Sequence, residues 1–310
     1  MKKLRRKMNK PNLILKQVLD DVNPPREELE LIKENLDKFL KEIKRRLHAE
    51  KIKADVFVGG SFAKETLIKK DNYDVDVFLR FDKQYKEEII SDLTGKLLRG
   101  IKHVSLVHGS RDYFRIQMGP LFYIEVIPVK KVRIPKDAEN ITDLSYSHVK
   151  YIKRKLKKEI LDEVRITKAF CYANKCYGAE SYIRGFSGYA LELLTYKYGG
   201  FLKFIRAMSK IKEKTVVDIE KLHKSKAAVM MDVNNSKLQS PIILIDPTYK
   251  QRNALAALSQ ETFGRFQEDC RKFLKAPSIK AFEIEKTDLT KIKEDADKKK
   301  QEFLLMEVRT

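Results

Sequence analysis

Three acidic residues and a small-residue turn stand where they could form a site for phosphate chemistry. Gly60-Ser61 follow a short apolar run, Asp74 and Asp76 alternate with valine in DVDVFLRF, and Glu125 lies in YIEVIPV. In a β-strand, residues i and i+2 point to the same face, so Asp74 and Asp76 are expected to lie side by side. If the strand that carries Glu125 is a neighbour, the three carboxylates converge at one edge of a sheet.

Carboxylates this close repel one another unless a cation lies between them. Hard oxygen ligands suit Mg²⁺, which binds through carboxylates together with substrate phosphates. Two such ions about 4 Å apart would activate an attacking 3′-hydroxyl group and stabilise a leaving pyrophosphate. The predicted catalytic residues and Mg²⁺ ligands are therefore Asp74, Asp76 and Glu125. Gly60 and Ser61 are the predicted phosphate-binding turn, because a small residue lets backbone N–H groups approach a phosphate. Either motif alone is common, and a solvated strand face is the alternative for DVD.

The charge of the chain points to a polyanionic partner. Its 310 residues include 65 Lys+Arg against 44 Asp+Glu, a net charge of +21, and 43% of them are apolar. Such an excess attracts nucleic acid. The alternative is a lysine-rich proteome from a hot or AT-rich organism, in which charge covers every surface. The basic N-terminus, MKKLRRKMNK, indicates either a solvated end or an arm that binds RNA.

Two further observations limit the class of protein. No apolar run approaches the roughly 18 residues of a membrane span, so no membrane partner is expected. The three cysteines lack CxxC pairing and suggest neither a zinc site nor a disulfide framework. The cytoplasm is therefore the expected compartment.

The acidic residues are expected to lie in an α+β first part of the chain. Residues 24–50 carry apolar side chains at 3–4 spacing, which predicts an amphipathic helix with Asn23 as its N-cap. A tight turn is predicted at 59–61, a short helix or loop over 62–69, and a helix over 87–99. Alternating apolar residues predict strands over 53–58, 74–81, 104–108, 113–118 and 121–129.

Helices are expected to dominate from about 147 to 210, with breaks at 177–178 and 184–188. A smaller mixed part should follow, with a helix around 215–224, strands near 227–233 and 241–245, a turn at Pro247 and a helix over 253–274. The nearly all-charged segment 286–302 predicts an exposed helix or a frayed tail. The expected domains are 1–143 (catalytic head), 144–212 (helical middle), 213–285 (α+β body) and 286–310 (charged C-terminal segment).

The segment VFVGGSFAKETLIKKDNYDVDVFLRF resembles the signature of the DNA polymerase β nucleotidyltransferase superfamily. Residues 162–201, which include RGFSGY, and residues 241–266, which include DP–RN–AALS, are similar to archaeal-type, class I CCA-adding enzymes. The resemblance covers roughly residues 25–280. It implies a polymerase-β-like nucleotidyltransferase head, a helical middle domain that binds the nucleotide, and a smaller α+β body.

The resemblance also implies roles for individual residues. Asp74 and Asp76 match the two metal-binding aspartates of the family, and Gly60 and Ser61 match its phosphate-binding turn. Four further residues are implied as nucleotide contacts: Lys168 and Tyr177 on the triphosphate, Arg252 on the incoming base together with the RNA, and His148 near the bound nucleotide. Each residue also has a purely structural alternative. Lys168 could be a surface cation and Tyr177 a core aromatic residue. Arg252 could be a charge at the start of a helix, and His148 could be a hydrogen-bonded structural histidine.

Three departures from the family pattern bear on these expectations. The third acid, usually aspartate, is Glu125, whose longer carboxylate changes the geometry toward a metal. The Arg-Gly that follows the phosphate turn is Lys64-Glu65 here, which adds an acid near the phosphate path. The family continues into a tail domain that holds the far end of the acceptor–TΨC half of tRNA. The expectation is therefore a shortened chain, a minimal relative or one half of a split protein.

The predicted function is template-independent, Mg²⁺-dependent transfer of nucleotides to an RNA 3′ end, adding all or part of CCA to tRNA from CTP and ATP. One alternative is a related terminal transferase with relaxed RNA choice, such as a poly(A)- or oligoadenylate-type enzyme. The other is a non-catalytic RNA-binding module on the same scaffold, against which the intact set of acids argues. The sequence leaves the oligomeric state open, a homodimer included.

Overall fold

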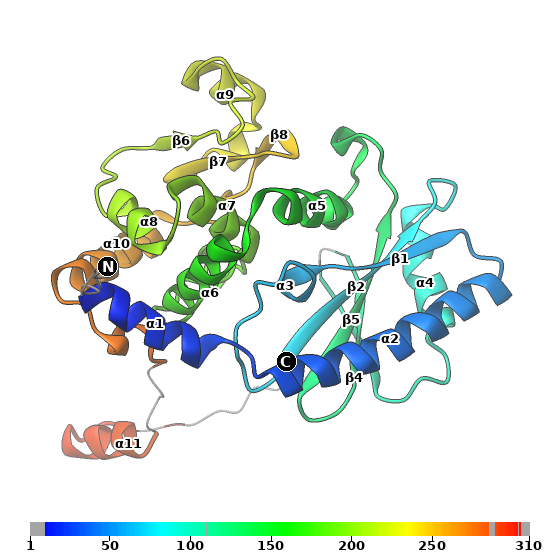
Figure 1. Ribbon diagram of the computed structural model, residues 1–310, viewed down its shortest axis with the longest axis horizontal. Coiled ribbons are helices and arrows are strands. Elements are labelled where there is room, and N and C mark those ends of the chain that lie inside the picture. The colour runs from blue at the N-terminus through cyan, green and yellow to red at the C-terminus, as the bar shows by residue number, and fades with distance from the viewer. Residues whose placement is uncertain (1–9, 110, 285–288, 303, 305–310) are drawn as a thin grey trace, which may run out of the picture.

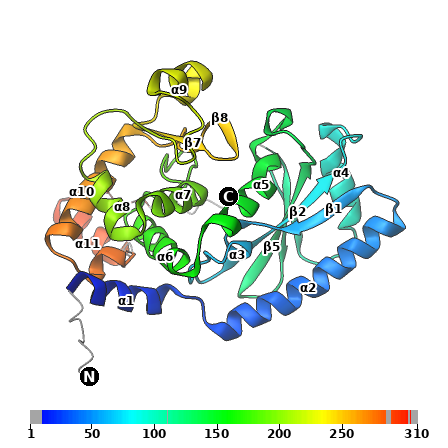
Figure 2. The ribbon, with the colours of Figure 1, turned by 45° about the horizontal axis from the view of Figure 1, so that its top comes forward.

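The computed structural model describes residues 10–109, 111–284, 289–302 and 304. Figure 1 shows two lobes side by side, one built around a β-sheet and the other mainly helical, and Figure 2 shows α3 and α5 lying between them. Most of the basic N-terminal arm considered above lies outside the described residues. Within them, no helix is both long and apolar enough to cross a membrane.

The first lobe is a mixed sheet covered by helices, as the alternating sequence predicts. Its strands run in the order β1-β2-β5-β4-β3. Inward-facing residues of the sheet, among them Val75 and Ile124, pack against two helices in one core. The elements are α2 (Arg26–Ala49), β1 (Ala54–Val58), α3 (Gly60–Ala63), β2 (Tyr73–Phe81), α4 (Glu87–Leu97), β3 (Val104–Val107), β4 (Tyr113–Gln117) and β5 (Phe122–Lys130).

Helix α2 forms because its apolar residues fall on one face. Ile32, Leu36, Phe39, Ile43 and Leu47 are its buried residues. The predicted N-cap is wrong, because Pro25 holds that position and no side chain caps the helix. The N–H of Asn23 instead donates to the carbonyl of Leu19 (3.1 Å), which ends an additional helix that the sequence analysis did not predict.

That additional helix, α1 (Lys10–Val22), belongs to the second lobe. Its residues Ile14, Leu15 and Val18 lie in one core with side chains from α5 to α8 and α10. The helices of this lobe are α5 (Ser145–Lys155), α6 (Lys158–Ala173), α7 (Gly188–Tyr198), α8 (Phe201–Met208) and α10 (Gln260–Lys275), with 3-10 turns η1 (Pro135–Asp137), η2 (Ile141–Leu144), η3 (Asn235–Lys237) and η4 (Ile279–Phe282). The predicted breaks near 178 and 186 are present.

A three-stranded sheet of order β6-β7-β8 lies on the second lobe. Its strands are β6 (Thr215–Val217), β7 (Ile242–Asp246) and β8 (Tyr249–Asn253). The predicted helix over 215–224 is wrong, because Thr215–Val217 pair in parallel with Ile242–Leu244. The predicted helix from 253 begins only at Gln260, where the Ser259 hydroxyl accepts from Thr262 N–H, because β8 occupies the preceding residues.

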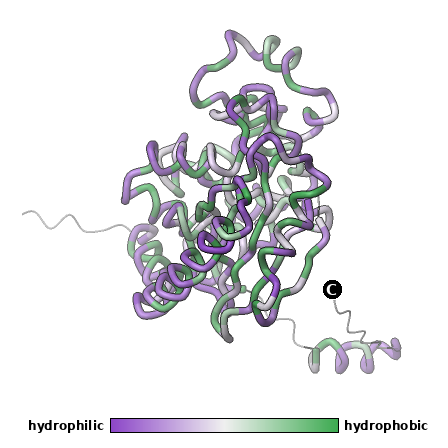
Figure 3. Tube along the Cα trace, turned by 90° about the vertical axis from the view of Figure 1, so that its right-hand side faces the viewer, coloured by the Kyte–Doolittle hydropathy of each residue, from purple (hydrophilic) through white to green (hydrophobic). Residues whose placement is uncertain are grey.

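The predicted strand over 227–233 is also wrong, because Lys226–Asp232 form the helix α9. The Ser225 hydroxyl accepts a hydrogen bond from the N–H of Ala228 and so caps this helix. A short apolar run such as AAVMM cannot be assigned to helix or strand by its period. The α9 segment stands out from the lobe at the top of Figures 1 and 3.

The predicted middle and body domains share one hydrophobic core, which holds residues from α6 and α7 together with Leu244, Leu255 and Phe266. Helix α1 joins the same core although it lies within 1–143, and the exact domain boundaries stay a prediction. Helix α11 (Leu289–Lys298) lies within the charged segment predicted as exposed. The side chains of its apolar residues Leu289 and Ile292 are exposed, which agrees with that prediction.

Candidate active site

The three predicted acids meet on one face of the head sheet. Strands β2 and β5 are parallel neighbours, and Asp76 lies directly across from Glu125 in their register. Asp74, two residues before Asp76, shares its face, while Val75 and Val77 point into the core on the other side. The prediction that the two acidic strands are adjacent is confirmed.

The turn at Gly60 lies against Asp76. Gly60 has a positive φ of 59°, and a Cβ at this position would overlap the Asp76 carboxylate. The N–H of Gly59 donates to the backbone carbonyl of Asp76 (2.8 Å), which holds the turn beside strand β2. Ser61 follows in the first turn of α3, and its carbonyl accepts from the N–H of Thr66 (2.9 Å). Glycine is therefore required at residue 60 by both backbone conformation and space.

The nearby cations do not fully offset the burial and the mutual repulsion of the acids. Burial of the carboxylate raises the pKa of Asp76 to about 7, and the negative charges of Asp74 and Glu125 add to the effect. The pKa of Glu125 is also raised by burial, although its hydrogen bond with Arg115 opposes the rise. Asp74 is partly neutralised by Lys70, whose Nζ lies 3.1 Å from its Oδ1.

Asp74 and Asp76 supply the kind of oxygen ligands that a hard cation needs. The pKa of Asp76 is raised although the charges of Lys64 and Lys70 lower it, so these lysines do not offset its burial and the neighbouring acids. Glu125 is already engaged, because Arg115 Nη2 lies 2.9 Å from its Oε1. Within the described residues, no group of three or more His, Cys, Asp or Glu side chains is arranged to hold one metal ion. Asp74 is likewise paired with Lys70, so the ion pairs do not separate the three acids, and the roles of all three stay predictions.

A cavity of about 410 Å³ opens above Asp76 and Glu125, between the head sheet and helices α5 and α7 of the second lobe, and Asp74 is not among the residues that line it. Volumes of several hundred Å³ are typical of sites for small ligands. The head contributes acidic and basic groups to its wall, and the second lobe contributes two stacked rings, those of His148 and Tyr189, whose centroids are 4.0 Å apart. The polar and aromatic residues that line it are Lys64, Asp76, Phe78, Arg111, Tyr113, Glu125, Thr142, Ser145, His148 and Tyr189, and Gly60 also contributes.

Lys168, a predicted triphosphate contact, is buried beside the cavity and does not line it. Its Nζ donates to Glu192 Oε1 (2.8 Å) and Thr66 Oγ1 (2.7 Å), and its side chain is 2% exposed. Glu192 Oε2 also accepts from Lys64 Nζ (2.7 Å), and Lys64 does line the cavity. Burial would raise the pKa of Glu192, but the charges of Lys168 and Lys64 outweigh it and hold that pKa at about 2.

Tyr177, the other predicted triphosphate contact, lies next to Lys168, outside the residues that line the cavity. A Cβ at Gly188 would lie 2.8 Å from the Tyr177 hydroxyl and 3.7 Å from Lys168 Cε. Burial raises the pKa of Tyr177, and the charge of Glu192 adds to the rise. The contacts of Lys168 and Tyr177 with a nucleotide stay predictions.

Glu65, which the sequence analysis placed near the phosphate path, faces another cavity. This space of about 720 Å³ lies behind α3, against α2 and α6, and Glu65 and Arg165 both line it. Of the Lys64-Glu65 pair, only the lysine faces the acids. The departure from the family pattern at this point therefore leaves a cation, and no added acid, in the wall of the cavity beside Asp76.

His148 and Arg252 meet on a single buried carboxylate, that of Asp246. His148 Nε2 lies 2.9 Å and Arg252 Nη1 lies 2.6 Å from Asp246 Oδ2. Tyr189 Oη donates to Asp246 Oδ1 (3.0 Å). Burial would raise the pKa of Asp246, but the hydrogen bond from His148 and the charges of His148 and Arg252 hold it well below its usual range. Burial also lowers the pKa of His148.

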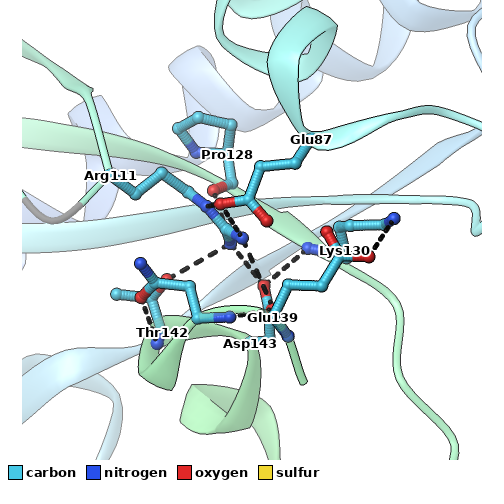
Figure 4. A network of polar contacts seen from close by, with 8 residues as sticks. Glu87, Arg111, Pro128, Lys130, Glu139, Thr142 and Asp143 are labelled. Atoms are coloured by element: carbon cyan, nitrogen blue, oxygen red, sulfur yellow. Dashed lines mark hydrogen bonds and ion pairs between the residues drawn. The ribbon is translucent and has the colours of Figure 1, made fainter. Parts of the chain in front are cut away.

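A second polar network fixes the chain between the two lobes (Figure 4). The guanidinium of Arg111 forms ion pairs with Asp143 and Glu87, the latter at 2.8 Å, and both Arg111 and Asp143 are buried. The Asp143 carboxylate also accepts from the N–H groups of Lys130 (2.8 Å) and Glu139 (3.1 Å). This network ties the end of β5 to η2. Because α5 starts directly after η2, it sets where His148 enters the cavity.

Several residues of the site were not predicted. Tyr189 and Asp246 lie inside segments that carry the family resemblance, but no role was given to them. Asp246 ends the apolar run PIILID, and Glu192 interrupts the apolar run YALELL. A lone acid in such a run is a signal for a buried, paired carboxylate. Arg115 gave no signal, because its place opposite Glu125 depends on the pairing of β4 with β5.

Comparisons with known sequences find similarity to tRNA nucleotidyltransferases. A family model described as tRNA nucleotidyltransferase, second domain, matches residues 162–283. The CCA-adding enzyme of Nanoarchaeum equitans is 37% identical over 247 residues, which cover 78% of this chain and 59% of that protein. The CCA-adding enzyme of Archaeoglobus fulgidus is 31% identical over 296 residues, covering 91% and 61%. The chain thus spans about three fifths of the length of these curated relatives.

Solved structures show the same fold at low sequence identity. The Cid1 poly(U) polymerase superposes with a TM-score of 0.68 at 13% identity, covering 88% of this chain and 98% of that one. CdnC of E. coli MS115-1 superposes with a TM-score of 0.59 at 16% identity, covering 88% and 94%. The predicted α+β fold with a polymerase-β-like nucleotidyltransferase head is confirmed.

Proposed function

We propose that this chain, a homologue of the archaeal CCA-adding enzymes, transfers cytidylyl and adenylyl groups from CTP and ATP to the 3′ end of tRNA. The observation that carries the proposal is the cavity that Asp76 and Glu125 share with Lys64, His148 and Tyr189. It combines paired carboxylates, a cation and an aromatic wall. A nucleoside triphosphate requires these same groups for its metal, its phosphates and its base.

The head residues would carry the chemistry of transfer. Asp74 and Asp76 would hold Mg²⁺, which supplies Lewis-acid stabilisation of phosphoryl oxygens when it is bound. Gly60 brings the backbone of the turn close to the phosphates, since it alone leaves room beside Asp76. Lys64 offsets the negative charge of the triphosphate from the cavity wall. Glu125, held by Arg115, lies on the same face and orients the attacking hydroxyl group.

The second lobe would bind the nucleoside. The stacked rings of His148 and Tyr189 form an apolar surface against which a base can stack. Arg252 lies behind them, with its guanidinium carbon 6.0 Å from the centroid of the Tyr189 ring. Lys168 acts indirectly. It forms an ion pair with Glu192, which also pairs with Lys64, and so it helps to hold Lys64 in place.

A related terminal transferase with relaxed RNA choice is the second candidate, since the fold is shared with a poly(U) polymerase. A non-catalytic RNA-binding module is the third candidate. It gives no reason for the burial of Asp76 beside two other acids, which raises the pKa of its carboxyl group. A cytoplasmic location and the oligomeric state stay predictions.

One experiment separates the three candidates. The protein is incubated with Mg²⁺ and a tRNA that lacks its 3′-terminal CCA, with each of the four NTPs separately and with CTP and ATP together. The proposal expects C from CTP, A only after C has been added, and little incorporation from UTP or GTP. Long homopolymers on any RNA would favour the relaxed transferase. Binding of tRNA without incorporation, equal to that of Asp76→Asn, would favour the non-catalytic module.

A further inference from the structure

The carboxylate of Asp246 lies at the centre of a buried set of hydrogen bonds that joins three segments of the second lobe. Its side chain is fully buried. Oδ1 accepts from the N–H and the hydroxyl group of Thr248, both at 2.8 Å, and from Tyr189 Oη at 3.0 Å. Oδ2 accepts from His148 and Arg252. The two oxygens therefore have different partners and different roles.

The Oδ1 contacts are explained by local structure. Asp246 is followed by Pro247 and Thr248, and an aspartate that accepts from the N–H two residues later forms an Asx turn. This turn connects β7 to β8. The Oδ2 contacts need another explanation, because they tie down two side chains that belong to the wall of the catalytic cavity and its surroundings.

Oδ2 fixes what His148 presents to the cavity. A carboxylate oxygen can only accept, so the proton of the neutral imidazole must lie on Nε2. Nδ1 is then a hydrogen-bond acceptor. Burial lowers the pKa of His148, which favours this neutral form. The ring is also held in orientation by stacking on Tyr189.

Oδ2 also fixes what Arg252 presents. Within the described residues, the guanidinium donates only through Nη1, to Asp246, which leaves its remaining N–H groups available as donors. The side chain is 21% exposed, so it is not sealed in the core. Asp246 thus holds one acceptor, His148 Nδ1, and one set of donors, on Arg252, near the same aromatic wall.

Cytosine and adenine share a feature that matches such a pair. Each presents an amino donor next to a ring-nitrogen acceptor, whereas uracil and guanine present a carbonyl acceptor next to a ring N–H donor. We propose that Asp246 is the positioning residue for base selection, and that it acts by holding the Arg252 donors and the His148 acceptor in the arrangement that fits cytosine and adenine. This inference rests on the proposed function and assigns the positioning of its base-selecting groups to the Asp246 carboxylate.

The test compares Asp246→Asn with the control Thr248→Val. Asparagine keeps the Oδ1 acceptor of the turn but places an amide donor against Arg252 and His148. Valine removes a hydroxyl group from Oδ1 and leaves Oδ2 untouched. The readout is the ratio of kcat/KM for CTP to that for UTP on tRNA lacking its CCA end. This ratio does not depend on the fraction of protein that is folded.

The ratio should fall by at least about tenfold in Asp246→Asn, as expected when a charge-assisted hydrogen bond that places a donor is lost. It should change by less than about twofold in Thr248→Val. In the double variant Asp246→Asn/Arg252→Ala the fall should be smaller than the product of the falls in the two single variants, because part of the effect of Asp246 passes through Arg252. If Asp246→Asn does not fold, Asp246→Ser serves, since serine can still form the turn but is too short to reach Arg252.

An unchanged ratio in the Asp246 variant, or an equal fall in Thr248→Val, would overturn the inference while leaving the transferase proposal intact. If the wild-type protein transfers no nucleotide, the proposed function fails. The inference is then decided by calorimetric dissociation constants for CTP and UTP in the presence of the same tRNA. A preference for CTP that Asp246→Asn removes supports it, and the absence of any preference in the wild type refutes it.

Discussion

Replacing Glu192 by glutamine would remove the one negative charge between two lysines at the junction of the lobes. Glu192 is fully buried, and its oxygens accept from Lys168, Lys64 and the Thr66 hydroxyl group at 2.7–2.8 Å. Glutamine has nearly the same shape but leaves the Lys168 ammonium, 2% exposed, without a counter-charge. A buried charge that loses its partner is among the costliest changes in a protein interior.

The size of the effect follows from the pKa of Glu192, which the lysines hold at about 2 against an ordinary value of 4.5. Because one pKa unit is worth about 1.4 kcal/mol, this shift corresponds to about 3 kcal/mol in favour of the ionised carboxylate at neutral pH. Burial lowers the pKa of Lys168 to about 8, which opposes part of this gain in the wild-type protein. Removal of one partner from other buried ion pairs costs about 3–5 kcal/mol, which is of the same order. We therefore expect Glu192→Gln to lower the free energy of unfolding by about 3 kcal/mol.

Urea unfolding at pH 7, followed by circular dichroism, measures this difference, and Glu268→Gln is the matched control. Glu268 is exposed in the middle of α10, where such a change is expected to cost less than about 0.5 kcal/mol. The pKa of Glu192 is lower in the folded protein than in the unfolded chain, so its contribution is complete above pH 4.5. This contribution is lost as the pH falls toward 2. The difference in the free energy of unfolding between wild type and Glu192→Gln should therefore become smaller over that range.

A decrease in the free energy of unfolding of under 1 kcal/mol at pH 7 would refute this account of the junction. So would a difference between wild type and Glu192→Gln that stays constant as the pH is lowered to the acid transition. Because Lys64 lines the cavity, Glu192→Gln should also raise the KM for CTP. Glu268→Gln should leave the KM unchanged.

Three further predictions concern the acids and the turn beside them. Asp76→Asn should lower transfer at least about a hundredfold in a primer-extension assay with Mg²⁺; its free energy of unfolding should not fall, because a carboxylate repelled by its neighbours is removed. Gly60→Ala should lower kcat by about a hundredfold, since the added methyl group displaces the Asp76 carboxylate; wild-type rates would show that the turn can move. Glu125→Gln should lower kcat with little change in the KM for CTP, whereas Glu125→Asp should remain active; steady-state kinetics at saturating RNA distinguish this from a purely structural role, which would leave kcat of both variants unchanged.

Local sequence patterns were sufficient for the head of the protein. Alternating apolar residues gave all five strands, and the 3–4 spacing in 24–50 gave α2, because period and burial agree along long elements. In the body the same patterns gave β7 but failed at other elements. Residues 215–217 form an edge strand only because β7 lies beside them. Residues 226–232 are a short segment whose pattern fits a helix or a strand, and the Ser225 cap favours the helix.

The sequence by itself determined the chemistry of the candidate site: two aspartates on one strand face, a third acid on another strand and a glycine before a serine. Tertiary structure decided which groups these acids meet. The parallel pairing of β2 with β5 brings Asp76 opposite Glu125, and β4 then sets Arg115 beside Glu125. The meeting of the lobes buries Lys168 on Glu192 and gathers His148 and Arg252 on Asp246. The physical reason is that spacing along a strand fixes only the direction of a side chain. Burial and ion pairing depend on segments as far as 128 residues apart, which pack together only in the folded chain.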